Sequence, residues 1–437
     1  MPSAEPYAAL FHDLLAADSV ETGSGVRTFR VDGQTPQCVL FPRSVDELCR
    51  CIRAADDAGL AIIPVGNGTQ LGIGRPPRRY DIALSTRRLR RLVAHEAADM
   101  TATVEAGLTL GDLNAALAAA GQWLPLDPPH AEHGTIGALI AADASGPLRL
   151  SQGKVRDLLI GITVVLADGT LVHGGGRVVK NVAGYDVMKL FTGSFGTLGL
   201  IVEATFKIRP RPAHEAIFIL PAASTEAAVR CAMDVLSAPV APLYIEALNQ
   251  VVASGLGADQ NGAAVVVGCG GSEQEVEGQR ESLGRQFGGV RPLSGAESER
   301  LIAALRNFPA EGQGEGAYGC KLSVLPSRLS DLLARVESEA TRHGLEAAVL
   351  SHVGSGVACV RFEADAIADE AFCRFAESLR AAVSGAGGWV VFDALPIGLK
   401  DRIDPWGDIP AMALMRGVKN TLDPHGRLSP GRFVGGI

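Results

Sequence analysis

The spacing of apolar residues along the first 75 residues predicts a helix, a buried strand and a glycine loop in succession. Apolar residues recur at helical spacing after Ser44-x-x-Glu47, a pattern that caps a helix N-terminus, and Gly59 suits its C-terminal end. The apolar run Leu60–Ile63 then has the length and β-branched content of a buried strand. Because Pro64–Gly74 follows directly, we expect a glycine loop at the carboxyl end of this strand.

The rest of the first half alternates short strands with helices. A helix is expected from Thr109 to Gly121, and helix competes with close backbone packing in the small-residue run Thr135–Gly146. Pro210 and Pro212 end the last strand of this half and mark a domain boundary. The expected strands are Ile82–Ser85, Leu92–His95, Thr101–Glu105, Leu159–Leu166, Leu171–His173 and Leu200–Ile208.

The second half predicts an antiparallel sheet covered by helices, in two rough copies. A mobile loop is expected at Glu297–Gly316 and a further helix at Ile409–Lys419. The expected strands are His214–Leu220, Leu243–Leu248, Ala263–Gly268, Ala317–Val324, Ala347–His352, Val357–Phe362 and Trp389–Phe392, and the expected helices are Ser224–Ser237, Gln274–Phe287, Arg328–His343 and Ala366–Ser384.

The glycine loop is suited to an anionic ligand, although it fits neither common nucleotide motif. Its glycines allow sharp bends and turn backbone N–H groups toward a phosphate. A third Rossmann glycine would fall on Leu71 or Pro77, and the Gly-Lys-Ser/Thr of a Walker loop is absent. Taken alone, the loop is also compatible with a simple turn.

Composition narrows the protein class. The chain of 437 residues is long enough for two or three domains, and its 47% hydrophobic and 20% charged residues indicate a globular protein. The net charge of −8 gives no general attraction for nucleic acid. We expect neither an export signal nor a transmembrane helix, and the scattered cysteines predict reduced thiols and no metal site. His130 and His133 are a weak metal signal.

Several motifs in fixed order resemble the vanillyl-alcohol oxidase/p-cresol methylhydroxylase type of FAD flavoproteins and, within it, the E-subunit type of bacterial glycolate oxidase. The resemblance spans nearly the whole chain and is weaker through residues 214–395. The motifs that carry it are Pro64–Gly74, Asp127-Pro-Pro, Thr135-Ile-Gly137, Ser145-Gly-Pro147, Val155-Arg-Asp157, Lys180-Asn-Val-Ala-Gly-Tyr-Asp186 and Gly193-Ser-x-Gly-Thr-Leu-Gly199.

This resemblance implies an α+β chain that binds FAD. A two-subdomain FAD-binding domain is expected over residues 1–212, an α+β substrate-type domain over 213–395, and a C-terminal segment, 396–437, packing back on the FAD domain. Without His or Cys in residues 64–74, the FAD is expected to be noncovalent. The residues implied in FAD binding are Gly66, Asn67, Gly68, Thr69, Gln70, Gly72, Thr135, Ile136, Gly137, Ala138, Ala142, Ser145, Arg156, Asp157, Gly161, Gly196, Thr197, Gly199 and Ile201.

The catalytic residues are less well defined than the cofactor site. The histidine-rich motif of the related D-type enzymes is reduced here to Ser351-His-Val-Gly-Ser-Gly356, and the family's C-terminal Asn-Pro-Gly is replaced by Ser429-Pro-Gly431. Lys180, Tyr185 and His352 are the candidates, each also explicable as a structural residue.

The resemblance therefore implies an FAD subunit of a glycolate oxidase complex that oxidises glycolate or a related 2-hydroxy acid. Electrons would leave through a D-type FAD subunit and an iron–sulfur subunit. The location would be cytoplasmic, and association with the inner face of the membrane would come through these partners. The alternatives are a stand-alone FAD-dependent D-2-hydroxy-acid dehydrogenase, of the D-lactate type, and a non-catalytic FAD-binding relay subunit.

Overall fold

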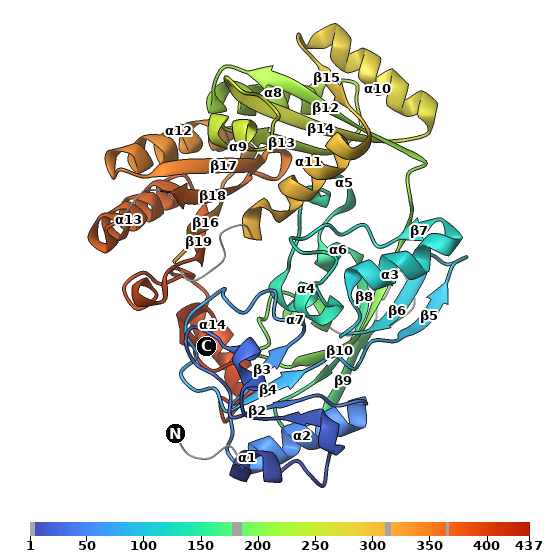
Figure 1. The fold of residues 1–437 in the computed structure, drawn as a ribbon, viewed down its shortest axis with the longest axis vertical. Helices are drawn as coiled ribbons and strands as arrows, with labels where there is room; N and C mark the ends of the chain where they lie inside the picture. The colour runs from blue at the N-terminus through green and yellow to red at the C-terminus, as the bar shows by residue number, and fades with distance from the viewer. Residues whose placement is uncertain (1–4, 177–185, 311–315, 364–366) are drawn as a thin grey trace.

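The structure, a computed structural model, describes residues 5–176, 186–310, 316–363 and 367–437 (Figure 1). The chain begins with α1 (Glu5–Ala9) and a four-stranded sheet in the order β1-β2-β4-β3, in which β2, β4 and β3 are parallel. As predicted, Ser44 begins α2 (Val45–Asp57), and its hydroxyl accepts the Glu47 N–H at 3.2 Å. The strands are β1 (Val20–Glu21), β2 (Cys38–Leu40), β3 (Ile62–Val65) and β4 (Ile82–Ser85).

A five-stranded antiparallel sheet in the order β5-β6-β10-β8-β9 follows. Its strands are β5 (Leu92–Glu96), β6 (Thr101–Glu105), β8 (Leu159–Val165), β9 (Leu171–Gly175) and β10 (Leu200–Lys207), while β7 (Gln122–Trp123) pairs with β11 (Arg209–Pro210). The helices of this region are α3 (Leu110–Leu117), α4 (Ile136–Ala142), α5 (Arg149–Gln152), α6 (Val155–Leu158) and α7 (Val187–Phe191). The run Thr135–Gly146, ambiguous in the sequence, thus forms a short helix that packs on β6 and β10.

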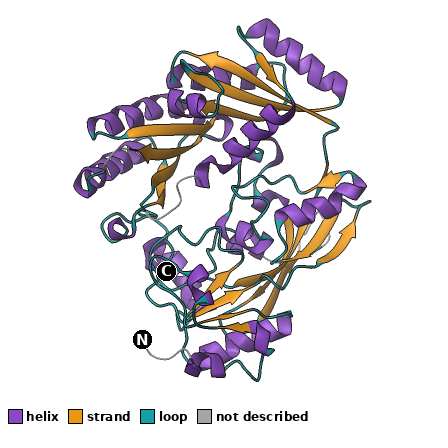
Figure 2. Cartoon of the chain, viewed as in Figure 1, coloured by secondary structure: helices purple, strands orange, loops and turns teal. Residues whose placement is uncertain are grey.

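The second half forms one eight-stranded antiparallel sheet in the order β15-β12-β14-β13-β17-β18-β16-β19 (Figure 2). Its strands are β12 (His214–Ala222), β13 (Pro242–Leu248), β14 (Ala263–Gly271), β15 (Arg291–Leu293), β16 (Tyr318–Ser323), β17 (Glu346–His352), β18 (Val357–Glu363) and β19 (Trp389–Ala394). Its helices are α8 (Thr225–Ser237), α9 (Gln250–Gly255), α10 (Glu273–Gln286), α11 (Gly295–Asn307), α12 (Pro326–Arg342) and α13 (Asp369–Gly385).

The two faces of this sheet have different surroundings. Phe218, Ile245 and Val360 belong to a core shared with α8, α10, α12 and α13. On the opposite face, Tyr244 and Leu350 pack with Leu148, α9 and α11. Since side chains alternate along a strand, every second residue of β13, β16, β17 and β18 faces the first half of the chain.

The predicted mobile loop at Glu297–Gly316 is wrong for its first part. Residues 295–307 form α11, because Leu301 and Leu305 are one turn apart and become buried against the sheet. The polar residues that precede them, Glu297–Arg300, are mainly exposed to solvent, and this polar run is typical of a loop in the sequence. The short edge strand β15 was not predicted, and residues 311–315 of the expected loop lie outside the described residues.

The C-terminal segment returns to the first half of the chain. After β19 it forms α14 (Met412–Leu422), and Leu428 makes a parallel bridge to Ile62 of β3. Lys419 of α14 is buried, and its ammonium donates to the carbonyls of Thr197 and Leu428 at 2.7 and 2.9 Å and to the Asp423 carboxylate. This lysine therefore fastens the second glycine loop, residues 193–199, to the end of the chain.

The fold confirms the predicted α+β class: a first half with a four-stranded and a five-stranded sheet is followed by an antiparallel sheet covered by helices. Among the described residues, no helix combines the length and apolar character needed to cross a bilayer.

Lys419→Met should lower the free energy of unfolding by about 3 kcal/mol, because it leaves the buried Asp423 carboxylate without its cation. Denaturant unfolding of the purified protein measures this loss. Arg416→Gln, an exposed change on the same helix, is the matched control and should cost less than about 0.5 kcal/mol. Equal losses in the two variants would contradict the structural role of Lys419.

Candidate functional site

The first glycine loop leaves β3 and folds against the start of α4. Gly68 adopts a φ of +82°, which only glycine reaches without strain. A Cβ on Gly66 would lie 2.0 Å from the Thr135 hydroxyl oxygen, so the loop passes directly over the residue that precedes α4. Both glycines are therefore required by the backbone path.

The second glycine loop meets the first from the other side. Phe195 and Gly196 have φ values of +55° and +67°, and a Cβ on Gly196 would lie 3.1 Å from the Pro64 ring. Phe195 in turn packs on Trp406 and Phe433 of the C-terminal segment, with ring centroids 4.9 and 5.7 Å apart. The two loops and the end of the chain thus form one continuous wall.

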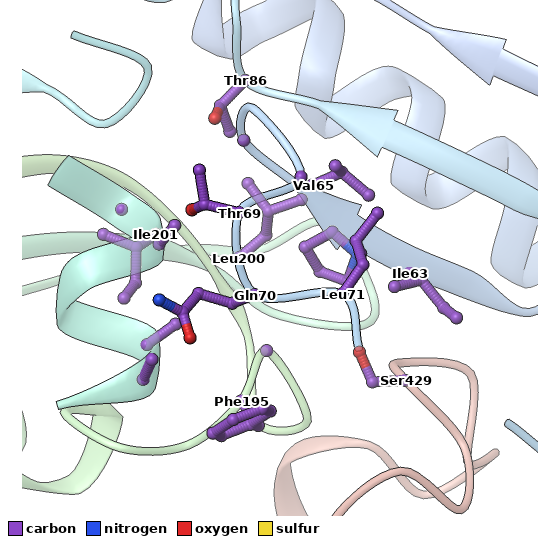
Figure 3. A pocket seen from close by; sticks show the side chains of 18 of the residues that line it. Ile63, Val65, Thr69, Gln70, Leu71, Thr86, Phe195, Leu200, Ile201 and Ser429 are labelled. Atoms are coloured by element: carbon purple, nitrogen blue, oxygen red, sulfur yellow. The ribbon is translucent and has the colours of Figure 1, made fainter. Parts of the chain in front are cut away.

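Figure 3 shows the pocket that these segments enclose, with Gln70, Phe195 and Ile201 around it. Ten of the residues implied in FAD binding line this pocket: Gly66, Gly68, Thr69, Gln70, Gly137, Ala138, Ala142, Gly196, Gly199 and Ile201. Most of these residues are small, which leaves the backbone open to a large planar ligand.

The other predicted cofactor residues lie outside this lining. Their side chains mainly serve local structure: Asn67 donates to the His133 carbonyl, Thr197 to the Ser194 carbonyl, and Asp157 accepts the Lys154 N–H. Gly72 lines a separate cavity beside Lys400. The remaining ones are Thr135, Ile136, Ser145, Arg156 and Gly161, none of which is on the pocket wall.

Sequence reasoning missed Arg432, the only cation on the pocket wall among the described residues. One Nη of its buried guanidinium donates to the carbonyls of Leu71 and Ile73, and the other has no partner. The hydroxyl of Thr69 is likewise buried without a partner. An unpaired guanidinium N–H, an unpaired hydroxyl and glycine-rich backbone suit the pyrophosphate of FAD. The residues present therefore fit this cofactor.

A second set of polar residues lies on the sheet face that points toward the first half of the chain. The His352 Nδ1 is 2.8 and 2.7 Å from the two carboxylate oxygens of Glu246, the residue opposite it in the strand register. Both side chains are almost fully buried. Burial raises the pKa of Glu246 well above its usual value and lowers the pKa of His352, so both directions favour a neutral pair.

Two cations lie beside this pair without hydrogen-bond partners among the described residues. Lys321 of β16 is adjacent to Cys359 in the strand register, and Arg149 begins α5, which packs on β13. Burial is the main cause that lowers the pKa of Lys321, and the charges of Arg149 and Lys154 lower it further. Lys154 pairs at 3.1 Å with Asp143, the residue after Ala142 on the pocket wall. The polar cluster therefore adjoins the end of the FAD pocket.

Of the predicted catalytic candidates, His352 belongs to this cluster, whereas Lys180 and Tyr185 lie outside the described residues. Glu246, Lys321 and Arg149 were missed. The alternation of Tyr244, Glu246 and Leu248 along a buried strand was the one available signal for Glu246. His130 and His133 are both exposed, and the described residues contain no group of three His, Cys, Asp or Glu that could hold a metal ion.

Two family models cover most of the chain. The FAD binding domain matches residues 36–175, and the C-terminal domain of FAD linked oxidases matches residues 211–391 and 406–433. The chain belongs to the FAD-linked oxidases. It is an FAD-dependent oxidoreductase, as the glycine loops and the resemblance predicted. The structure of p-cresol methylhydroxylase with substrate bound has the same fold, with a TM-score of 0.78 at 15% identity over 99% of this chain and 97% of that one.

The relatives correct the predicted subunit type. A probable mitochondrial D-lactate dehydrogenase of Danio rerio is 28% identical over 97% of this oxidase and 90% of its own length. Glycolate oxidase subunit GlcE of Escherichia coli is 38% identical over only 34% of this chain and 42% of its own. Subunit GlcD of Bacillus subtilis, 34% identical, is likewise matched over 49% of this chain and 46% of its own length. The E-subunit assignment was therefore wrong, because the matches that run along nearly the whole chain include D-lactate dehydrogenases, whereas the match to GlcE is partial.

Gly68→Val should weaken FAD binding by at least about tenfold, because valine is strained at a φ of +82°. Gly72→Ala is the matched control, since an added Cβ there has no neighbour within 4 Å and the residue is off the pocket wall. Titration of the FAD-free protein with FAD measures both affinities. Normal FAD affinity in Gly68→Val would show that the loop is only a turn.

Glu246→Gln should change the pH dependence of stability. A carboxyl whose folded-state pKa is raised stabilises the fold below its unfolded pKa of about 4.3, and this contribution is lost as the pH rises through the folded-state pKa. Glutamine is a neutral mimic of the protonated form. The variant should therefore resemble the wild type near pH 5 and unfold at a higher temperature than the wild type near pH 9. A variant that is less stable at both pH values would contradict a neutral Glu246.

Proposed function

We propose that this FAD-linked oxidase oxidises a D-2-hydroxy acid, with D-lactate as the representative substrate, to the 2-oxo acid, and that one chain suffices for the reaction. The observation that carries the proposal is the cluster of Arg149, Lys321 and the Glu246–His352 pair beside the FAD pocket. The match to D-lactate dehydrogenases along nearly the whole chain supports it.

Each cation of the cluster has a role in this proposal. The unpartnered guanidinium of Arg149 binds the substrate carboxylate, a pairing for which its planar N–H groups are suited. Lys321, whose pKa is lowered, accepts the proton of the substrate hydroxyl as the carbonyl forms. FAD, when bound, supplies the acceptor for the hydride that leaves the substrate carbon.

In this proposal the Glu246–His352 pair affects the net charge of the site and the orientation of the imidazole. As a neutral pair it adds no net charge, so the positive potential of Arg149 is retained for an anionic substrate. Its two hydrogen-bond distances below 3 Å also fix the imidazole on the sheet face. In this proposal the pair takes the place of the histidine-rich motif, which is reduced to His352 in this sequence.

Anaerobic rapid mixing of the purified, FAD-loaded chain with 2-hydroxy acids tests the proposal. D-Lactate should bleach the flavin absorbance near about 450 nm without any added protein, and L-lactate should not. Glycolate is included because of the partial matches to glycolate oxidase subunits. The absence of bleaching by every acid, in protein with a full complement of FAD, would overturn the stand-alone function while leaving the family assignment intact.

Lys321→Met should slow flavin reduction by about 10²- to 10⁴-fold at unchanged FAD content, because it removes the proton acceptor. In the wild type, the reduction rate should rise with pH as Lys321 loses its proton and level off below pH 10.5. Lys207→Met, a change in β10 away from the cluster, is the control for loss of a lysine. A normal rate in Lys321→Met would assign proton transfer to another group.

A further inference from the structure

A cavity of about 580 Å³ lies between the two halves of the chain, apart from the FAD pocket. Its walls come from α3 and the segment that follows it, from β12–β14, and from α11. No residue on its wall is shared with the FAD pocket. None of the residues assigned to the cofactor or to the proposed reaction lies on its wall.

The wall of this cavity combines apolar surface with unpaired hydrogen-bond donors. Leu126, Leu148, Leu243 and Ile302 supply aliphatic surface. The Trp123 indole N–H is buried without an acceptor, and so is the Nε–H of Arg306. Buried donors without partners are uncommon because their desolvation is not compensated. A ligand with an acceptor oxygen would satisfy them.

Arg306 is weakly paired within the protein. Its guanidinium lies 3.8 Å from the Glu132 carboxylate, whose side chain is 72% exposed. A water-exposed contact of this length offers little stabilisation, so the cation is available to another anion. The nearby Asp127 does not compete strongly, because burial raises its pKa to about 8 and leaves it mainly protonated at neutral pH.

The charges at the rim restrict the kind of anion. Three carboxylates, those of Glu215, Glu299 and Glu132, and one cation, Arg211, are exposed where the wall reaches solvent, so negative charge predominates there. Three carboxylates at the entrance disfavour ligands that carry several negative charges, such as nucleotides. One cation inside, aliphatic walls and unpaired donors together favour a single carboxylate with an apolar body.

We propose that this cavity is a binding site for an aliphatic monocarboxylate of medium chain length. The carboxylate pairs with Arg306, and the chain lies along Leu126, Leu148, Leu243 and Ile302. The cavity lies beside the polar cluster, since Leu148 and Tyr244 on its wall are close in the chain to Arg149 and Glu246. None of the four cluster residues lies on its wall, so the octanoate experiment tests this site independently of the proposed reaction.

Isothermal titration of the full-length, FAD-loaded protein with octanoate tests this site. One octanoate should bind per chain, and 1-octanol, which keeps the tail and lacks the charge, should bind at least about tenfold more weakly. Octanol that binds as tightly as octanoate, or no saturable octanoate binding, would overturn the proposal.

Arg306→Gln should weaken octanoate binding by at least about tenfold, because it removes the cation that pairs with the carboxylate. Arg300→Gln, on the exposed side of the same helix, is the matched control and should bind as the wild type does. Lys321→Met should also retain octanoate binding, which separates this cavity from the 2-hydroxy-acid site. FAD content and unfolding temperature show that each variant is folded. Unchanged affinity in folded Arg306→Gln would contradict the proposed site.

Discussion

The cofactor pocket depends on buried cations of the C-terminal segment that bind the carbonyl groups of the first glycine loop. The Arg432 guanidinium donates to the carbonyls of Leu71 and Ile73. The Lys400 ammonium donates to the Gly72 carbonyl at 2.7 Å and forms an ion pair with Asp32. Three consecutive carbonyls are thus directed to the protein's own cations. Because a trans peptide places C=O and the following N–H on opposite sides, the loop's path and its exposed N–H groups are fixed together. A glycine loop, flexible by itself, becomes a defined anion site in this way.

The same segment connects the two halves of the molecule. It leaves the eight-stranded sheet after β19 and ends against β3, so a shift of the sheet relative to the loops would disturb Lys400, Arg432 and Lys419 together. All three cations are nearly inaccessible to solvent, and breaking any of these contacts leaves buried polar groups unpaired. The pocket and the polar cluster on the sheet face are therefore held in a fixed relation by contacts of the C-terminal segment, one of which, that of Arg432, lies on the pocket wall itself.

Local patterns in the sequence predicted most of this architecture. The capped helix α2, the strands β4 and β6 and the seven longer strands of the large sheet follow from short-range apolar spacing. Contacts between distant residues could not be predicted in this way. Arg432 and Leu71 are 361 positions apart, and Glu246 and His352 are 106 apart, and no local signal pairs them. The role of a glycine was also ambiguous in the sequence. Gly68 and Gly161 were both expected at the cofactor site, but Gly68 lines the pocket, whereas Gly161 packs on Thr205 within a sheet.

The charges beside the pocket have two connected consequences. Arg149 and Lys154 lie close enough to Lys321 to lower its pKa, and in the proposed reaction the same charges attract the carboxylate of the substrate. When an anion binds next to Arg149, part of this repulsion on Lys321 is cancelled, so its affinity for a proton rises at the moment when the hydroxyl proton must be removed. Substrate binding and base strength are thus coupled through one local field. A site with Lys321 alone would lack this coupling. Lys154, which pairs with Asp143 at the end of α4, contributes to it because its charge also lowers the pKa of Lys321.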